Sequence, residues 1–161
     1  GFSVRHMVFA KVRGRFARWS GLVQLDPAHP TGGRVEVTID ASSIDTGVPD
    51  RDAHLRSADF FDVEKFPVAR FDSTEVKEGS DVKAGEGQAP FTHTVTGNMD
   101  LHGQKKSITF PARIDTSGDA IKASTEFNLN RFDFGIEYKG KPDDLIKKEV
   151  LLKIAFEAPK K

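Results

Sequence analysis

Five histidines are the residues of this sequence with the widest chemical range, because imidazole binds metals and transfers protons near neutral pH. No pair of them has the spacing of a metal site, neither H-x-H nor H-E-x-x-H, so histidines far apart in sequence would have to meet through the fold. Two are expected in solvated turns, His29 and His102. A metal-dependent or stress-related enzyme that uses His6, His54 or His93 remains the alternative. For His6 and His54, structural hydrogen bonding is the favoured interpretation.

Nucleophilic catalysis has little support in the sequence. The chain contains no cysteine, which excludes thiolate nucleophiles, thiolate metal ligands and disulfides. No G-x-S-x-G nucleophile elbow is present. The only G-x-G, Gly85-Glu86-Gly87, lacks the strand-to-helix context of a phosphate-binding loop. No catalytic residue and no metal site are therefore predicted, and the protein is not expected to be an enzyme.

A few charged residues stand in contexts that suit a specific contact. Arg51, Asp52 and His54 are close together in a segment without strand alternation, and Arg131 stands among phenylalanines. A buried arginine needs a partner, because an unpaired desolvated charge is costly. The favoured interpretation is an ion pair of Arg131 with Asp52 or Asp133. The functional alternative is contact of these polar residues with an anionic or quinone headgroup.

Composition narrows the class of protein. The chain has 161 residues, a size that fits one domain over residues 1–161. Its 24 basic residues balance its 24 acidic ones, which argues against a nucleic-acid partner. No apolar run approaches the length of a transmembrane segment. Because Phe2 already resembles the middle of a strand, the natural start of the chain is expected to be missing.

The elements that must position these residues are β-strands. Apolar and polar residues alternate with a period of two along most of the chain, the pattern of strands with one buried face. Residues 49–57 break the alternation and predict a short helix that leads to Phe60 and Phe61. Eight strands are predicted, near residues 2–15, 21–25, 34–41, 68–76, 91–101, 108–114, 121–129 and 150–156.

The connections predict an antiparallel meander. Residues 102–105, His-Gly-Gln-Lys, suit a tight hairpin in which Gly103 has a positive φ, and residues 116–119 suit a second one. Residues 78–90 predict a long exposed hairpin tip, and residues 139–148 a polar loop. Closure of such a meander removes exposed edges, so an eight-stranded antiparallel barrel is favoured over a sandwich.

Phenylalanine supplies almost all the aromatic area, with 13 Phe against one Tyr and one Trp. Phe offers apolar surface without a polar group to satisfy. An ordinary packed core is one interpretation, and an apolar cavity for an apolar ligand is the sharper one. Under the second interpretation the expected pocket residues are Phe16, Phe60, Phe61, Phe71, Met99, Leu101, Phe110, Phe127, Phe132 and Phe134.

Spaced motifs along nearly the whole chain resemble the YceI-like family of lipid-binding bacterial proteins. The longest are IDTG at residues 44–47 and RDAHLRSADFFDV at residues 51–63. The others follow in the order of the family pattern: FSVRHM at 2–7, GRF at 14–16, KFP at 65–67, FDST at 71–74, VTGNMDLHG at 95–103 and RFDFG at 131–135.

This resemblance implies a fold and a function. It implies a lipocalin-like eight-stranded antiparallel barrel with a short helical insertion. It also implies an elongated pocket for a long apolar ligand, namely a polyisoprenoid, an isoprenoid quinone or a fatty-chain lipid, in a periplasmic or secreted protein without a cofactor. Met99 stands where the family often has Leu, a change that conserves volume. The long polar faces of a barrel are also compatible with a homodimer.

Overall fold

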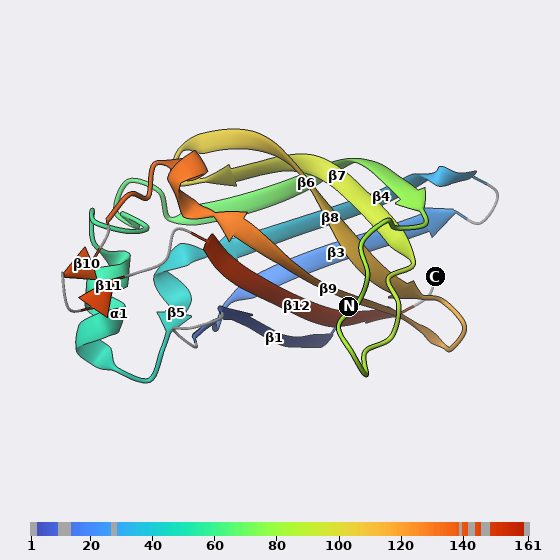
Figure 1. Ribbon diagram of the computed structural model, residues 1–161, viewed down its shortest axis with the longest axis horizontal. Coiled ribbons are helices and arrows are strands. Elements are labelled where there is room, and N and C mark those ends of the chain that lie inside the picture. The colour runs from blue at the N-terminus through green and yellow to red at the C-terminus, as the bar shows by residue number, and fades with distance from the viewer. Residues whose placement is uncertain are drawn as a thin grey trace.

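The computed structural model describes residues 3–9, 14–26, 29–138, 140–141, 144–145 and 149–159. Strands make up most of this part of the chain, and helices form only short segments at one end (Figure 1). The elements are β1 (Ser3–Phe9), β2 (Arg15–Phe16), β3 (Trp19–Asp26), β4 (His29–Asp40), η1 (Ala41–Ser43), β5 (Ile44–Asp45), α1 (Pro49–Arg56), β6 (Val68–Glu78), β7 (His93–Leu101), β8 (Gln104–Asp115), β9 (Ala120–Asn130), η2 (Arg131–Phe134), β10 (Gly140–Lys141), β11 (Asp144–Leu145) and β12 (Glu149–Pro159).

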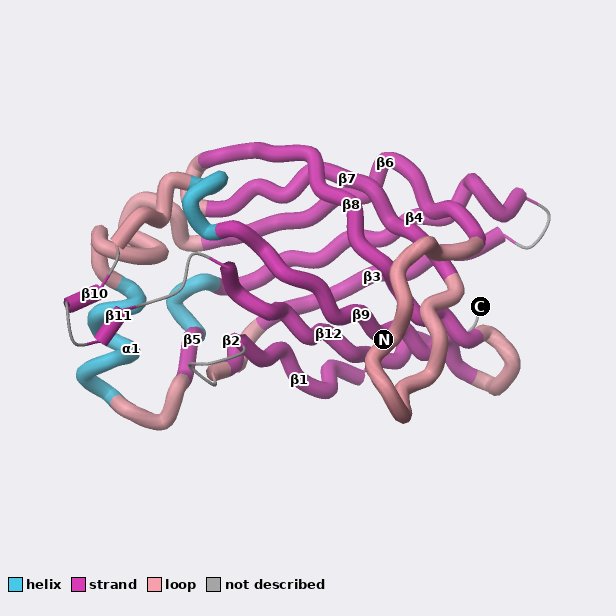
Figure 2. Tube along the Cα trace, in the orientation of Figure 1, coloured by secondary structure: helices cyan, strands magenta, loops and turns pink. Residues whose placement is uncertain are grey.

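Eight of the strands form one antiparallel sheet in the order β1-β12-β9-β8-β7-β6-β4-β3. The sheet curls until β3 lies against β1 and β12, so its two ends approach each other around an apolar interior (Figure 2). β2 pairs with β5, and β10 with β11, in two small additional sheets. The predicted eight-stranded antiparallel barrel is confirmed, and the alternative of a two-sheet sandwich is not what the chain forms.

The period-two alternation decides which face of each strand lies inside. Val35, Val37 and Ile39 of β4 are buried, whereas the preceding Arg34 is exposed and the intervening Glu36 and Thr38 are only half-buried. The antiparallel register then aligns inner residues of neighbouring strands, because Val37 pairs with Phe71, and Phe71 with Met99. A continuous apolar core follows from this register.

Tight turns connect the strands as expected. Only two residues, His102 and Gly103, separate β7 from β8, and their φ angles are 55° and 73°. Positive φ at both central residues is the geometry of a type I′ hairpin, whose twist matches that of the strands. The positive φ predicted for Gly103 is confirmed. Residues 116–119 and the exposed connection between β6 and β7 also agree with expectation.

A β-bulge in β6 helps the sheet to curl. The register of β6 against β7 shifts between Ser73 and Glu75. Opposite the bulge, Gly97 lies so close to β6 that a Cβ there would come within 2.6 Å of the Phe71 ring and 2.7 Å of the Ser73 Cα. The Ser73 hydroxyl accepts a hydrogen bond of 2.8 Å from the amide of Val35 on β4. The bulge and the glycine together allow the close approach that curvature requires.

Helical segments cover one end of the barrel, on the left in Figure 1. α1 begins at Pro49, which suits the first helical position, and carries Asp50 and Asp52 in its first turn. The helix predicted over residues 49–57 is thereby confirmed. Within the described residues, no helix is long and apolar enough to cross a membrane. Of the predicted loop 139–148, the short β10–β11 pair is described, and the rest lies outside the described residues.

Candidate functional site

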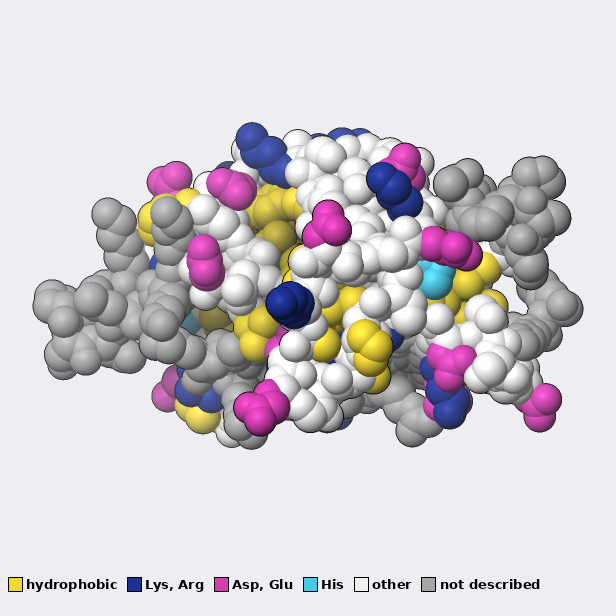
Figure 3. All heavy atoms as spheres, turned by 45° about the vertical axis from the view of Figure 1, so that its right-hand side comes forward, with side chains coloured by type: hydrophobic (Ala, Val, Ile, Leu, Met, Phe, Trp, Pro, Cys, Tyr) yellow, Lys and Arg dark blue, Asp and Glu magenta, His cyan; other side chains and the backbone are white. Residues whose placement is uncertain are grey.

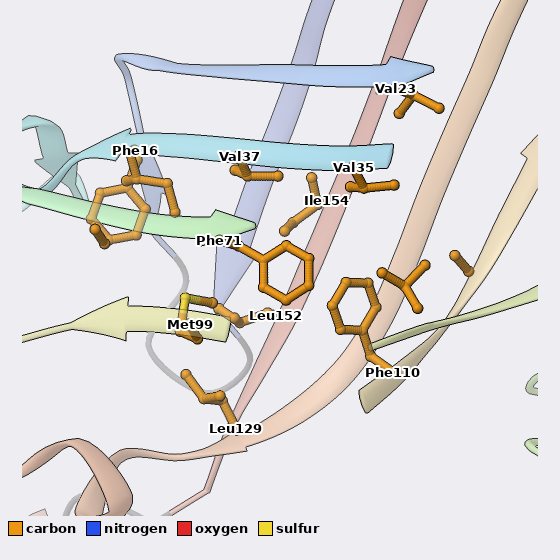
Figure 4. Packing of buried hydrophobic residues seen from close by; sticks show 14 of the residues in the cluster. Phe16, Val23, Val35, Val37, Phe71, Met99, Phe110, Leu129, Leu152 and Ile154 are labelled. Carbon is orange, nitrogen blue, oxygen red and sulfur yellow. The ribbon is translucent and has the colours of Figure 1, made fainter. Parts of the chain in front are cut away.

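Most of the pocket residues expected from the sequence lie in the barrel interior, but they differ in role. Those in the buried core cluster are Phe16, Phe71, Met99, Phe110 and Phe134. Phe61, Leu101 and Phe127 are half-buried and pack against that cluster. Figure 4 shows Phe71 and Phe110 facing each other, with Phe16, Met99 and Leu129 on one side and Val23 and Val35 on the other.

Two of the expected pocket residues, Phe60 and Phe132, lie at the helical end and outside the core cluster. Phe60 is buried, but its ring packs edge-on against Tyr138, with 5.1 Å between ring centroids. Phe132 is half-buried, and its ring lies 4.9 Å from the guanidinium carbon of Arg131. These two rings stabilise the end structures, and the structure does not place them on the pocket described next.

An apolar pocket of about 40 Å³ opens between the inner faces of the strands, toward the end opposite α1. Valine, alanine and isoleucine side chains supply most of its wall. The hydroxyl of Thr125, a polar group in that wall, is already engaged, because it donates a hydrogen bond to the carbonyl of Pro111. The lining residues are Val23, Val35, Val37, Val95, Phe110, Ala112, Ile114, Ala123, Ser124, Thr125 and Ile154.

Phe110 is the one member of the expected set that lines this pocket. The sequence prediction did not include the smaller aliphatic residues of the wall, because it rested on the surplus of phenylalanine. The signal for them was present, since the alternation already assigns Val35, Val95 and Ala112 to the inner face of their strands. Figure 3 shows one outer face of the molecule. Hydrophobic side chains reach the surface in the middle of that view and, beside a histidine, toward its right-hand side.

His93 lies on the inner face of β7 near this pocket. It pairs across the sheet with Ala112, a pocket residue, and is half-buried. Its Nδ1 lies 2.7 Å from the hydroxyl of Thr92. Burial lowers the pKa of His93 below its ordinary value, while the nearby charge of Glu78 acts in the opposite direction. The neutral imidazole is therefore favoured beside the apolar pocket.

The polar residues of α1 anchor the helix to the preceding segment. Asp52 is buried and accepts hydrogen bonds from the amide and the hydroxyl of Thr46. Arg51 donates to the Thr46 carbonyl at 3.0 Å, and Arg56 to the carbonyls of Ser42 and Ile44. Burial by itself raises the pKa of Asp52, but the Thr46 hydrogen bonds and the charges of Arg56 and Arg51 outweigh it, and the pKa falls below its ordinary value.

Arg131 is buried, as expected, but its contacts differ from those predicted. Its Nη1 donates a 2.9 Å hydrogen bond to the carbonyl of Ile136, and burial lowers its pKa. Asp52 is bound to Thr46 instead, and Asp133 is exposed. Among the described residues, neither predicted ion pair, Arg131–Asp52 or Arg131–Asp133, forms. Arg131–Asp52 was wrong because the distance between the two residues depends on how η2 and α1 pack. Arg131–Asp133 was wrong because, on the same short helix η2, Arg131 is buried and Asp133 is exposed.

The histidines do not converge where their position is described. His54 lies in α1, 2.8 Å from a carboxylate oxygen of Asp59 and edge-on against Phe60 and Tyr138. His93 begins β7 at the opposite end of the barrel (Figure 1). The side chains of His6 and His29 lie outside the described residues. In the part of the chain that the structure describes, no group of three His, Asp or Glu residues could hold a metal ion.

His102 corrects one further expectation. It lies in a turn, as predicted, but it is half-buried rather than fully solvated. Its Nδ1 is 2.9 Å from the carbonyl oxygen of Phe134, and its ring packs against Phe66 at a centroid distance of 5.0 Å. The β7–β8 turn is thereby tied to η2, a contact between segments that no local pattern indicates.

Comparison with known proteins gives a consistent picture. A family model for the YceI-like domain matches residues 1–158. A UPF0312 protein of Pseudomonas aeruginosa is 37% identical over 142 residues, which cover 84% of this chain and 69% of that protein. A UPF0312 protein of Vibrio cholerae is 35% identical over 147 residues, covering 86% of this chain and 72% of the relative.

Solved structures share the architecture over nearly the whole chain. The YceI protein of Campylobacter jejuni superposes with a TM-score of 0.77 at 25% identity, covering 100% of this chain and 92% of the other. BcnA of Burkholderia cenocepacia gives a TM-score of 0.79 at 22% identity, with 98% and 96% covered. A polyisoprenoid binding domain from Saccharophagus degradans gives 0.67 at 19% identity, with 99% and 98% covered. The last two similarities concern the fold alone.

Proposed function

The chain belongs to the YceI-like family, and from this premise we propose that it binds or transports a long-chain apolar ligand inside the barrel. The ligand class is a polyisoprenoid, an isoprenoid quinone or a fatty-chain lipid. The observation that carries the proposal is the pocket on the inner strand faces, whose wall is built mostly from Val, Ala, Ile and Phe residues. The role is binding rather than catalysis.

The chemistry of the pocket matches an apolar chain better than a polar metabolite. A polar ligand would need unoccupied hydrogen-bonding groups to replace its lost water. The Thr125 hydroxyl is engaged by the Pro111 carbonyl, and eight of the ten other lining residues are Val, Ala or Ile. The related fold of the Saccharophagus degradans domain, which is described as polyisoprenoid binding, supports the same ligand class.

Binding of a long chain requires the pocket to widen. Its volume of about 40 Å³ suits the end of a chain rather than a whole lipid. Burial of apolar ligand surface contributes about 25 cal/mol per Å², from which the cost of separating packed side chains must be subtracted. A ligand that contacts several hundred Å² of wall still gains enough to bind. Such a pocket discriminates by length and shape more than by chemical group.

Filling the pocket tests the proposal directly. Ala123 lines the pocket from β9, whereas Asn128 of the same strand is exposed. Ala123→Phe is expected to weaken binding of a fluorescent fatty acid and of isoprenoid alcohols at least about tenfold. Asn128→Phe, the matched control, should leave binding unchanged. Native mass spectrometry and organic extraction of the purified protein should show a co-purifying lipid, and a wild-type protein that binds none of these probes would overturn the proposal.

Two further parts of the proposal concern location and assembly. A carrier of membrane lipids suits the periplasm or the exterior of the cell, and fractionation of producing cells tests this location. The exposed polar strand faces suit a homodimer, and light scattering coupled to gel filtration tests the oligomeric state. If the protein is found only in the cytoplasm, the proposed location is wrong. If it is found only as a monomer, the proposed homodimer is wrong. Neither result affects the proposal of lipid binding.

A further inference from the structure

We propose that three phenylalanines, Phe71, Phe110 and Phe127, form a barrier across the barrel interior that sets the length of apolar chain the protein accepts. We call these three residues the Phe barrier. The inference rests on the proposed function, because it assigns a length limit to the same lipid pocket.

The Phe barrier is a continuous set of ring contacts from three strands. Phe71 of β6 and Phe110 of β8 have ring centroids 5.1 Å apart and planes inclined by 59°. Phe110 and Phe127 of β9 are stacked, with 4.6 Å between centroids and 10° between planes. Phe110 therefore lies between the other two rings, and displacing it breaks favourable contacts on both sides.

The Phe barrier separates two parts of the interior. Phe110 lines the pocket, whereas Phe71 and Phe127 do not. Figure 4 shows Val23 and Val35, which line the pocket, on one side of Phe71 and Phe110, and Met99 and Leu129 on the other. Val37, a third pocket residue, lies level with Phe71, its partner in the sheet. The far side consists of buried, packed side chains that continue toward the helical end. A chain that enters the pocket thus meets the Phe110 ring before it reaches that region.

The position of the barrier along β8 gives an expected chain length. Phe110 and Ile114 both line the pocket and are four residues apart, or about 13 Å along a strand. An extended chain spans about 3.5 Å for every three backbone bonds, so this depth holds about 11 bonds, or about three isoprene units. The whole of β8, Gln104–Asp115, is about 37 Å long and would accommodate about 30 bonds.

The lining on the pocket side explains why the limit falls at the rings. Ala112 and Ala123 project only a methyl group toward the pocket, and Val95 only a small branched side chain, so the wall there leaves more room for a ligand than an aromatic stack does. Parting the Phe barrier instead requires the ring of Phe110 to leave both neighbours in a close-packed interior. Shorter chains therefore bind without disturbing the barrier, and longer chains bind only if it opens.

The experiment compares isoprenoid alcohols of two, three, four and eight isoprene units, with binding measured by displacement of a fluorescent fatty acid and by native mass spectrometry. The wild-type protein should prefer about three units. Phe110→Ala and Phe127→Ala should each shift the preference to longer chains, with about a tenfold gain for eight units relative to three. Phe61→Ala is the control, because this half-buried ring packs on Phe16 instead and should leave the preference unchanged.

The outcomes separate this inference from the proposed function. Binding of isoprenoid alcohols with the same length preference in the wild type and in both barrier variants would overturn the Phe barrier while keeping lipid binding. A wild-type preference for eight units would overturn it as well. If Phe110→Ala fails to fold, Phe127→Ala decides, since Phe127 is only half-buried. A wild type that binds no chain of any length overturns the proposed function itself.

Discussion

The buried carboxylate of Asp52 accepts hydrogen bonds from both the amide and the hydroxyl of Thr46, six residues earlier in the chain. This contact fixes the start of α1 to the segment that follows β5. Arg51 donates hydrogen bonds to the carbonyl oxygen and to the hydroxyl of the same threonine. In the sequence, Arg51 and Asp52 were candidates for contact with a ligand headgroup. In the structure, their hydrogen bonds to Thr46 hold the helix over the end of the barrel.

Removing this carboxylate should destabilise the fold. Asp52→Ala leaves two donors of Thr46 without their acceptor in a partly buried site, and we expect the free energy of unfolding to fall by about 2–3 kcal/mol. Urea denaturation followed by circular dichroism measures the change. Asp50→Ala, at an exposed position of the same helix, is the control and should change stability by less than about 0.5 kcal/mol. Equal losses in both variants would contradict a structural role for Asp52.

Gly97 should tolerate no side chain. Gly97→Ala would place a Cβ 2.6 Å from the Phe71 ring and 2.7 Å from the Ser73 Cα, inside the normal contact distance. Because backbone must move to relieve the contact, we expect a loss of about 2–3 kcal/mol in the free energy of unfolding. Gly118→Ala has open space around its Cβ and serves as the control. A Gly97→Ala protein as stable as Gly118→Ala would show that β6 and β7 are not held this closely.

His93 should make stability depend on pH in the weakly acidic range. Burial lowers its pKa in the folded state, so the unfolded state binds more protons below the ordinary histidine pKa. The contribution of neutral His93 to the free energy of unfolding is present above about pH 6.5 and is lost as the pH falls toward the lowered pKa of the folded state. His93→Gln should therefore reduce the loss of stability between about pH 7 and pH 5. Thermal unfolding at a series of pH values measures this, and parallel curves for the two proteins would refute it.

Thr125 should contribute to stability but not to ligand binding. Thr125→Val keeps the shape of the side chain but removes the hydrogen bond to the Pro111 carbonyl, at an expected cost of about 1 kcal/mol. The pocket wall becomes more apolar, so affinity for a fluorescent fatty acid should stay the same or increase. Denaturation and binding titrations on the same preparation check both effects. A marked loss of affinity at unchanged stability would assign the hydroxyl a direct contact with the ligand.

The sequence predicted the local features well because they depend on neighbouring residues. The alternation of Val35, Val37 and Ile39 assigns one face of β4 to the interior, since successive side chains of a strand point to opposite faces. The positive φ of Gly103 follows in the same way from the two-residue hairpin. The eight strands of the main sheet and the helix α1 were therefore predictable, whereas the two short strand pairs β2–β5 and β10–β11 were not predicted. The family resemblance is confirmed by the family model.

The candidate site was predicted only in part, because a pocket depends on distances between strands. The sequence shows that Phe60 and Phe110 are both large and apolar, but Phe110 lines the pocket and Phe60 packs at the helical end. The sequence likewise left open whether Asp52 pairs with Arg131. Thr46 is its partner, because the turn before α1 brings the two residues together.

By itself, then, the sequence determined which residues face inward, where the chain turns and to which family it belongs. Only the tertiary structure decided that Phe71, Phe110 and Phe127 touch, that the pocket lies beside them, and that His54 and His93 stand at opposite ends. The physical reason is that strand alternation is local, whereas contacts across the interior depend on register and curvature. The register and the curvature of the sheet are fixed by the bulge in β6 and by the close approach of β6 and β7 at Gly97. These two features lie far from most of the residues that the curvature brings together.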